Sequence, residues 1–142
     1  MRKVRAALAI KVVLMLIATF ASTGVCLLSA SGDTFDLLKG ATTTGVGKVV
    51  NVSYGEFRTW SCDVLVSDNT TTAIKVRVEG NQGGGLFSPT GMAEYTLSGA
   101  ELAAGIGSFS ITDMPINTIR ANLLTLTGGS SPAVTVRCTG VK

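Results

Sequence analysis

The chain of 142 residues contains no histidine. This absence excludes Ser/His/Asp and Cys/His catalysis, and it excludes zinc sites built on histidine. The carboxylates that remain for acid–base chemistry have no motif around them: Asp63, Glu79, Glu94, Glu101 and Asp113. A carboxylate pair can hydrolyse a glycosidic bond, but isolated carboxylates are typical of solvated strand ends and helix caps. The sequence therefore predicts a protein that is not an enzyme and that uses no metal or cofactor.

Charged residues are also few, and the positive charge is concentrated at one end. Residues 1–30 hold four basic residues and no acidic one: Arg2, Lys3, Arg5 and Lys11. Of the 12 Lys and Arg in the chain, eight therefore lie beyond this segment, against nine Asp and Glu. A near-neutral remainder without a basic cluster has no electrostatic footprint for nucleic acid or for an anionic membrane surface. We expect protein partners, including further copies of this chain, and no nucleic acid.

The first 30 residues have the three parts of a signal peptide. A basic segment ends at Lys11, an apolar core covers residues 12–21, and small residues follow over 22–30. Such a segment directs export, so we expect the rest of the chain to be extracellular, on the cell surface or periplasmic. Cleavage after Ala21 and cleavage after Ala30 both fit the pattern.

Two other interpretations of this leader stay open. Residues 12–32 carry no charge, and about 20 apolar residues can cross a bilayer as a helix, so an uncleaved membrane anchor is one alternative. Lipidation at Cys26 is another, although Val25 is larger than the residue that usually precedes such a cysteine. In each case the remainder of the chain lies outside the cytoplasm.

Cysteine is scarce, and the leader accounts for one of the three. The other two, Cys62 and Cys138, both lie in segments where apolar residues alternate with polar ones. In each segment the cysteine falls on the apolar side, so paired or packed strands can bring the two sulfurs together. An exported domain with two cysteines predicts one disulfide; two separate buried thiols are the alternative.

Period-two alternation predicts an all-β domain made of short antiparallel strands. The turn residues at 67–70 predict a hairpin between strands 57–66 and 73–78. The Gly- and Ser-rich residues 127–132 predict a second pair, between strands 119–126 and 133–138, in which Leu123-Leu124 interrupts the alternation and indicates a bulge. Residues 48–53 and 108–112 are further strands.

The only helical signal is short. Ser98 and Glu101 form a capping box and Gly105 follows as a stop, which predicts one or two helical turns. The expected architecture is an antiparallel β-sandwich of six or seven strands with this single helical turn, preceded by a hydrophobic leader helix. We divide the chain into the leader (1–30), an N-terminal extension (31–47) and the sandwich domain (48–142).

Candidate binding residues lie next to loops. Tyr54 and Tyr95 are the aromatic residues best placed for exposed contacts, and Gly83, Gly84 and Gly85 form a flexible tip or a site of close backbone approach. Trp60 shares the side of its strand with Cys62, so we expect it in the core. Asp68 before Asn69 is more typical of an Asx-turn than of a calcium ligand.

The order of these segments resembles a β-sandwich module of phage and prophage virion proteins that is also seen in bacterial surface and pilus-associated proteins. The resemblance runs from Phe35 onward, and its segments are the Gly-rich loop at 80–85, Leu97-Ser98-Gly99-Ala100-Glu101-Leu102-Ala103-Ala104-Gly105, Ile119-Arg120-Ala121-Asn122, Leu126-Thr127-Gly128-Gly129 and Val134-Thr135-Val136-Arg137. The leader and the cysteine pair depart from the phage pattern and favour the cell-surface branch. The resemblance implies a structural or adhesive role without catalytic residues.

Two functions follow from these observations. The first is an exported, non-enzymatic structural or interaction protein, a subunit or accessory component of an extracellular assembly such as a filament or pilus. The alternative is a secreted β-sandwich module that binds carbohydrate or another ligand through exposed aromatic residues and loops.

Overall fold

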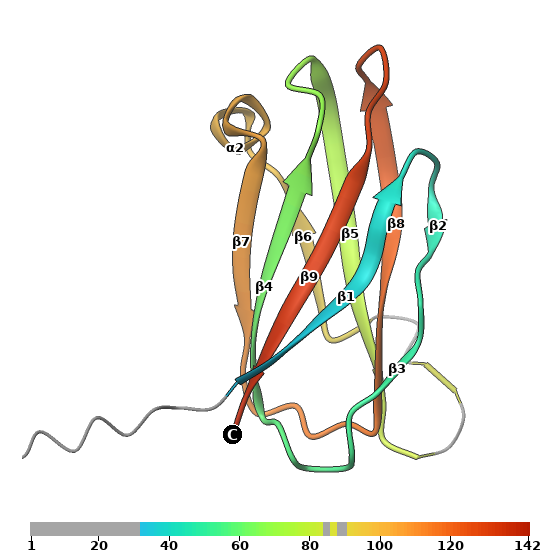
Figure 1. The fold of residues 1–142 in the computed structure, drawn as a ribbon, viewed down its shortest axis with the longest axis vertical. Coiled ribbons are helices and arrows are strands. Elements are labelled where there is room, and N and C mark those ends of the chain that lie inside the picture. Colours follow the sequence, from blue (N-terminus) through green and yellow to red (C-terminus); the bar gives the residue numbers. More distant parts are fainter. Residues whose placement is uncertain (1–31, 84–85, 88–90) are drawn as a thin grey trace, which may run out of the picture.

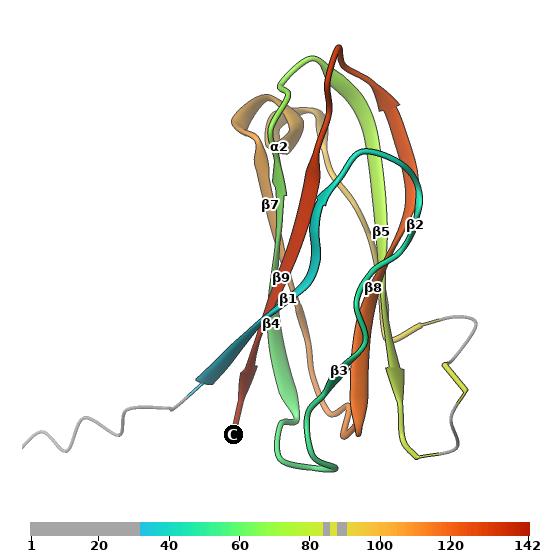
Figure 2. The ribbon, with the colours of Figure 1, turned by 45° about the vertical axis from the view of Figure 1, so that its right-hand side comes forward.

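The computed structural model describes residues 32–83, 86–87 and 91–142, which form two facing β-sheets (Figures 1 and 2). The predictions for the leader, Gly84 and Gly85 fall outside these residues. The elements are β1 (Gly32–Ala41), β2 (Gly45–Val46), β3 (Val50–Asn51), β4 (Thr59–Val66), β5 (Thr71–Asn81), β6 (Ala93–Thr96), α2 (Gly99–Ala104), β7 (Ile106–Ile111), β8 (Thr118–Gly128) and β9 (Val134–Val141). Sheet A has the order β1-β9-β4-β7, and sheet B the order β2-β8-β5-β6 with β3 also paired to β8. The predicted all-β antiparallel sandwich is confirmed, but the described residues form nine strands in place of the six or seven expected, because the N-terminal residues and short edge segments also pair.

The core lies between the sheets and follows from the alternation in the sequence. In β4 every second residue, from Trp60 to Val66, is buried, and the residues between them face outward. At one end of the core, Trp60, Phe57 and Phe35 form an aromatic cluster, with ring centroids of Phe57 and Trp60 5.3 Å apart. Trp60 is fully buried, as its position in the alternating pattern predicts.

Both predicted hairpins are wrong in their pairing. Strands β4 and β5 belong to different sheets, because β4 pairs with β7 and β9 whereas β5 pairs with β6 and β8. Strands β8 and β9 are likewise split between the sheets. The turns at 67–70 and 129–133 do reverse the chain, but each carries it across the core to the facing sheet. The residues of a turn indicate a reversal without indicating which sheet receives the next strand.

The predicted N-terminal extension forms part of the sandwich. Strand β1 pairs with β9 from Gly32 opposite Val141 to Ala41 opposite Val134. Leu37 and Leu38 of this strand are buried. Because these side chains complete the core, the sandwich includes the residues from Gly32 onward and does not begin at residue 48.

The disulfide between Cys62 and Cys138 is present, as predicted. The two cysteines are register partners on β4 and β9, their Cα atoms lie 4.0 Å apart, and both side chains are fully buried. The bond therefore joins neighbouring strands of sheet A on the core side. It closes a loop between residues 76 positions apart.

Two smaller predictions are also confirmed. Ser98 and Glu101 form the capping box of α2, and Gly105 ends the helix with a φ of 73°. The register of β8 against β5 shifts between Leu123 and Thr125, which leaves Leu124 as the bulged residue.

One side of the sandwich is closed by a close approach of backbone at Gly47. The Gly47 amide donates to the Ala121 carbonyl of β8 (2.7 Å), and the Lys48 amide donates to the Leu37 carbonyl of β1 (2.9 Å). A Cβ atom at Gly47 would lie 2.1 Å from the Leu37 oxygen. We call this contact of residues 47–48 with Ala121 and Leu37 the Gly47 seam, and only glycine fits at position 47.

Candidate functional site

Tyr95 lies on β6 and closes the side of the sandwich opposite Gly47. Its ring stacks on Phe109 of β7, with centroids 4.7 Å apart and planes inclined by 20°. Its hydroxyl donates to the Glu101 carboxylate and accepts from the Ser108 amide. The contact with Glu101 raises the pKa of Tyr95, with burial adding to the effect. This half-buried side chain is occupied by contacts within the fold, whereas the sequence suggested an exposed contact.

The other sequence candidates come from separate loops. Tyr54, between β3 and β4, is 62% exposed. Gly83, beyond the end of β5, is exposed, and its amide donates to the Asn81 side-chain oxygen at 2.6 Å. Tyr54 is therefore the aromatic candidate that reaches solvent.

Four of the five carboxylates noted in the sequence have partners of their own. Glu101 caps α2, and Asp63 accepts from the Ser108 hydroxyl at 2.6 Å. Glu79 and Glu94 lie on the outer face of sheet B and pair with cations there. Glu101 is a helix cap, as predicted, whereas Glu79 is nearly fully buried in the sheet and is not the solvated strand end that the sequence suggested.

The outer face of sheet B carries a charged network. Glu79, nearly fully buried, accepts from Arg120 at 2.7 Å and from Asn122 at 3.2 Å. Arg77 and Lys75 both contact Glu94 on β6. The ring of Phe87 lies 3.9 Å from the Arg120 guanidinium carbon and stacks over it. The charges of this face thus contact one another across β8, β5 and β6.

The outer face of sheet A has short polar side chains arranged in rows that run across the strands. The strand register defines a hydroxyl row, a charged row and a third row that ends in two apolar residues. In the order β1, β9, β4, β7, the hydroxyl row is Thr34, Thr139, Ser61, Ser110, and the charged row is Asp36, Arg137, Asp63, Ser108. The third row, from β9 to β7, is Thr135, Leu65, Ile106.

The charged row is held in place by side-chain contacts. Arg137 Nε donates to Asp36 Oδ1 at 2.7 Å, which lowers the pKa of Asp36 and raises that of Arg137. Asp63 adds a weaker Coulombic attraction to Arg137. About half of the Arg137 side chain remains exposed. Alternation along single strands did not reveal these rows, because they depend on the register between strands distant in sequence.

Asp68 links the two turns at the far end of the sandwich. Its carboxylate accepts from the amides of Thr70 (2.9 Å), Ser130 (2.8 Å) and Ser131 (3.0 Å). These hydrogen bonds hold the pKa of Asp68 well below its usual range. The contact with Thr70 is the predicted Asx-turn, and the contacts with Ser130 and Ser131 tie it to the β8–β9 turn.

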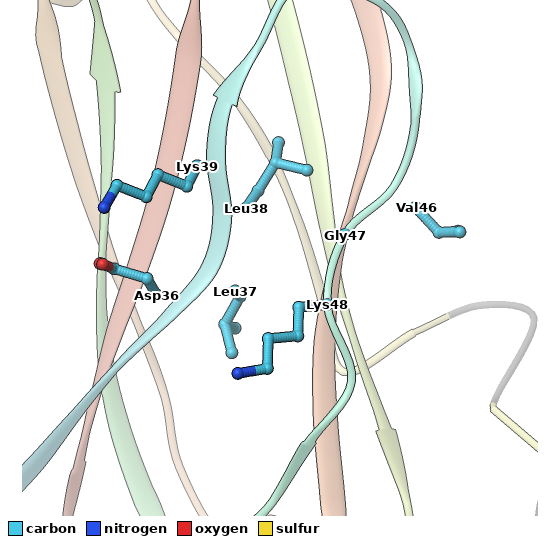
Figure 3. Close-up of a pocket in the computed structure, with 7 residues that line it drawn as sticks. All are labelled: Asp36, Leu37, Leu38, Lys39, Val46, Gly47 and Lys48. Carbon is cyan, nitrogen blue, oxygen red and sulfur yellow. The ribbon is translucent and has the colours of Figure 1, made fainter.

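A shallow hollow of about 490 Å³ lies beside the Gly47 seam (Figure 3). It is lined by Asp36, Leu37, Leu38, Lys39, Val46, Gly47 and Lys48. In Figure 3 the ammonium groups of Lys39 and Lys48 lie on either side of β1, so they do not converge on one point. The hollow therefore lacks the convergent polar groups typical of a ligand pocket.

The described residues contain neither a metal-binding cluster nor a membrane-spanning helix. Within residues 32–83, 86–87 and 91–142, His, Cys, Asp and Glu side chains do not gather in any group of three or more that could hold a metal. The same part of the chain includes no helix with the length and apolar character to cross a membrane.

Comparison with known proteins gives distant structural likenesses. No protein-family model and no curated protein matches the chain. A solved structure of the SPBc2 prophage-derived protein YomS aligns with a TM-score of 0.49 and 15% identity, over 79% of this chain and 94% of that one. The PBSX exported protein XepA aligns with a TM-score of 0.49 and 17% identity, over 79% of this chain and 39% of that one. Likenesses at this level carry no argument about this chain.

Proposed function

We propose that this chain is an exported, non-enzymatic structural or interaction protein. It acts as a subunit or accessory component of an extracellular or cell-surface assembly such as a filament or pilus. The observation that carries the proposal is the outer face of sheet A, where ordered rows of short polar side chains span all four strands. Such a face is regular enough to pack against another protein and contains no convergent catalytic group.

The disulfide supports export. Disulfides persist in oxidising compartments and are rare in the cytosol. The bond between Cys62 and Cys138 stabilises the same sheet that carries the ordered outer face. An assembly outside the cell would expose its subunits to conditions in which this bond remains formed.

Self-association of the purified domain tests the proposal. Residues 32–142, produced with the disulfide formed, should associate as concentration rises, as measured by light scattering after size-exclusion chromatography and by electron microscopy. A protein that remains monomeric at every concentration, and that captures no protein from the surface of its native host, would contradict the assembly role.

Carbohydrate binding is the second candidate, and the exposed ring of Tyr54 supports it. Exposed aromatic rings contact the apolar faces of sugars. Saturable binding of a glycan by the monomer, lost in Tyr54→Ala and retained in Phe109→Leu, would favour this function over assembly. Phe109 is the control because its ring already stacks on Tyr95 within the fold.

A further inference from the structure

The charged row of sheet A is complementary to itself. From β1 to β7 its members are Asp36, Arg137, Asp63 and Ser108, which carry a negative charge, a positive charge, a negative charge and a hydroxyl. Reversed, the row places a cation opposite each central anion and a hydroxyl opposite each terminal carboxylate. Adjacent strands are about 4.8 Å apart, so the two copies of the row have the same spacing.

A two-fold axis parallel to the strands and midway between β9 and β4 produces this reversal. With two sheets A face to face, Arg137 of each copy faces Asp63 of the other. Asp36 faces the Ser108 hydroxyl of the other copy, and in the hydroxyl row Thr139 faces Ser61. The Ser108 hydroxyl donates to Asp63 of its own chain, and in the pair it turns to donate to Asp36 of the other copy, because Asp63 then pairs with Arg137. The other members of the two rows each meet a group with which they can form a hydrogen bond or an ion pair.

The charge pattern also selects this axis over its alternative. A two-fold axis perpendicular to the strands along the charged row would place Arg137 over Arg137 and Asp63 over Asp63. Like charges facing each other across an interface repel and disfavour that arrangement. Packed sheets are usually rotated by about 30° relative to each other, so residues far from the centre of the interface move furthest apart. The charged row lies near the middle of β4, β7 and β9. Its central members therefore stay opposite each other.

We propose that sheet A of one chain packs face to face on sheet A of a second copy, with two ion pairs between Arg137 and Asp63 at the centre. This pairing rests on the proposed function and identifies the surface and the partner. Four strands about 4.8 Å apart, each about eight residues long at about 3.3 Å per residue, span roughly 500 Å². This is less than the roughly 800 Å² per partner of a standard interface. The association is therefore weak, dependent on concentration, and weaker at high salt because its central contacts are charged.

Charge reversal tests the pairing in solution. Arg137→Asp alone places two anions opposite each other twice, and Asp63→Arg alone does the same with cations. Each single variant should weaken the dimer and raise its dissociation constant by about tenfold or more. An equimolar mixture of the two variants, and the double variant Arg137→Asp/Asp63→Arg, should both recover association close to that of the original protein. Analytical ultracentrifugation at low and high salt measures all of these.

Lys75→Asp on sheet B is the matched control, since it also reverses a partly exposed cation that pairs with a single carboxylate. It should leave association unchanged, and circular dichroism should show that every variant folds. If the original protein associates and charge reversal has no effect, or if the mixture fails to recover association, the pairing is wrong while the assembly function stands. If the original protein never associates, the pairing is wrong, and the host-capture experiment then decides the assembly function.

Discussion

On the outer face of sheet B, three cations and two carboxylates contact one another, and an aromatic ring covers part of the network. On the outer face of sheet A, the side chains are mostly short hydroxyls, and the charged row leaves about half of Arg137 exposed. The charges of sheet B form one connected network, whereas those of sheet A form separate contacts, Arg137 with Asp36 and Ser108 with Asp63. The proposed pairing uses the exposed part of Arg137, and the described residues of sheet B offer no comparable row.

The disulfide marks the largest difference between the sheets, because both of its cysteines belong to sheet A. Cys62→Ser and Cys138→Ser should each lower the free energy of unfolding by about 4 to 5 kcal/mol, since either change removes the same bond. Chemical denaturation under non-reducing conditions measures the loss. Unequal losses, or a reduced form as stable as the oxidised one, would contradict this role of the bond.

Glu79 on sheet B and Asp63 on sheet A test the comparison directly. Glu79→Ala leaves Arg120 and Asn122 without their shared acceptor in a nearly buried site, so we expect a loss of about 2 to 3 kcal/mol. Asp63→Ala removes a hydrogen bond at a more exposed site and should cost about 0.5 kcal/mol. Thermal and urea unfolding of both variants provide the measurement, and equal losses would remove the distinction between the faces.

The Gly47 seam joins the two sheets and should be sensitive to a single methyl group. Gly47→Ala forces a Cβ atom against the Leu37 carbonyl, so the backbone must shift at a cost of about 2 kcal/mol. Gly99→Ala is the control, because a Cβ atom there meets no atom within 4 Å. Hydrogen exchange of the β1 and β8 amides should rise in Gly47→Ala alone, and unchanged exchange would show that the seam tolerates the methyl group.

Asp68 is expected to have an effect that depends on pH. Its pKa is lower in the folded chain than the value of about 3.9 in an unfolded one, so its stabilising contribution is present above pH 4 and lost as the pH falls further. Asp68→Asn should therefore lower the melting temperature at pH 7, and the difference should shrink toward pH 2. A difference that stays constant with pH would show that the carboxylate charge is not involved.

Features encoded by neighbouring residues were predictable from the sequence. The capping box of Ser98 and Glu101, the bulge at Leu124 and the burial of Trp60 each depend on a few adjacent positions or on alternation within one strand. The disulfide was predictable because only two cysteines, Cys62 and Cys138, lie outside residues 1–30. These signals gave the fold class but not the order of the strands.

The sheet to which each strand belongs could not be predicted. Strands β4 and β5 are consecutive and joined by good turn residues, yet β4 pairs with β9 at the far end of the chain. Such long-range pairing depends on how two buried faces fit together, which a turn does not encode. The rows of sheet A were missed for the same reason, since Asp36, Arg137 and Asp63 become neighbours only through that pairing. Tyr95 was misjudged because its partner Phe109 comes from the other sheet.

The pairing of Gly32 with Val141 gives the sandwich a polarity along its long axis. The chain enters the first strand and leaves the last one at the same end, as Figure 1 shows, whereas the Asp68 turn and α2 lie at the opposite end. A tether attached before Gly32 and a tag attached after Lys142 would therefore emerge side by side. If the domain is attached to a surface through either terminus, that end of the sandwich faces the surface. The outer face of sheet A then stands at right angles to the surface, where a neighbouring domain attached in the same way can reach it.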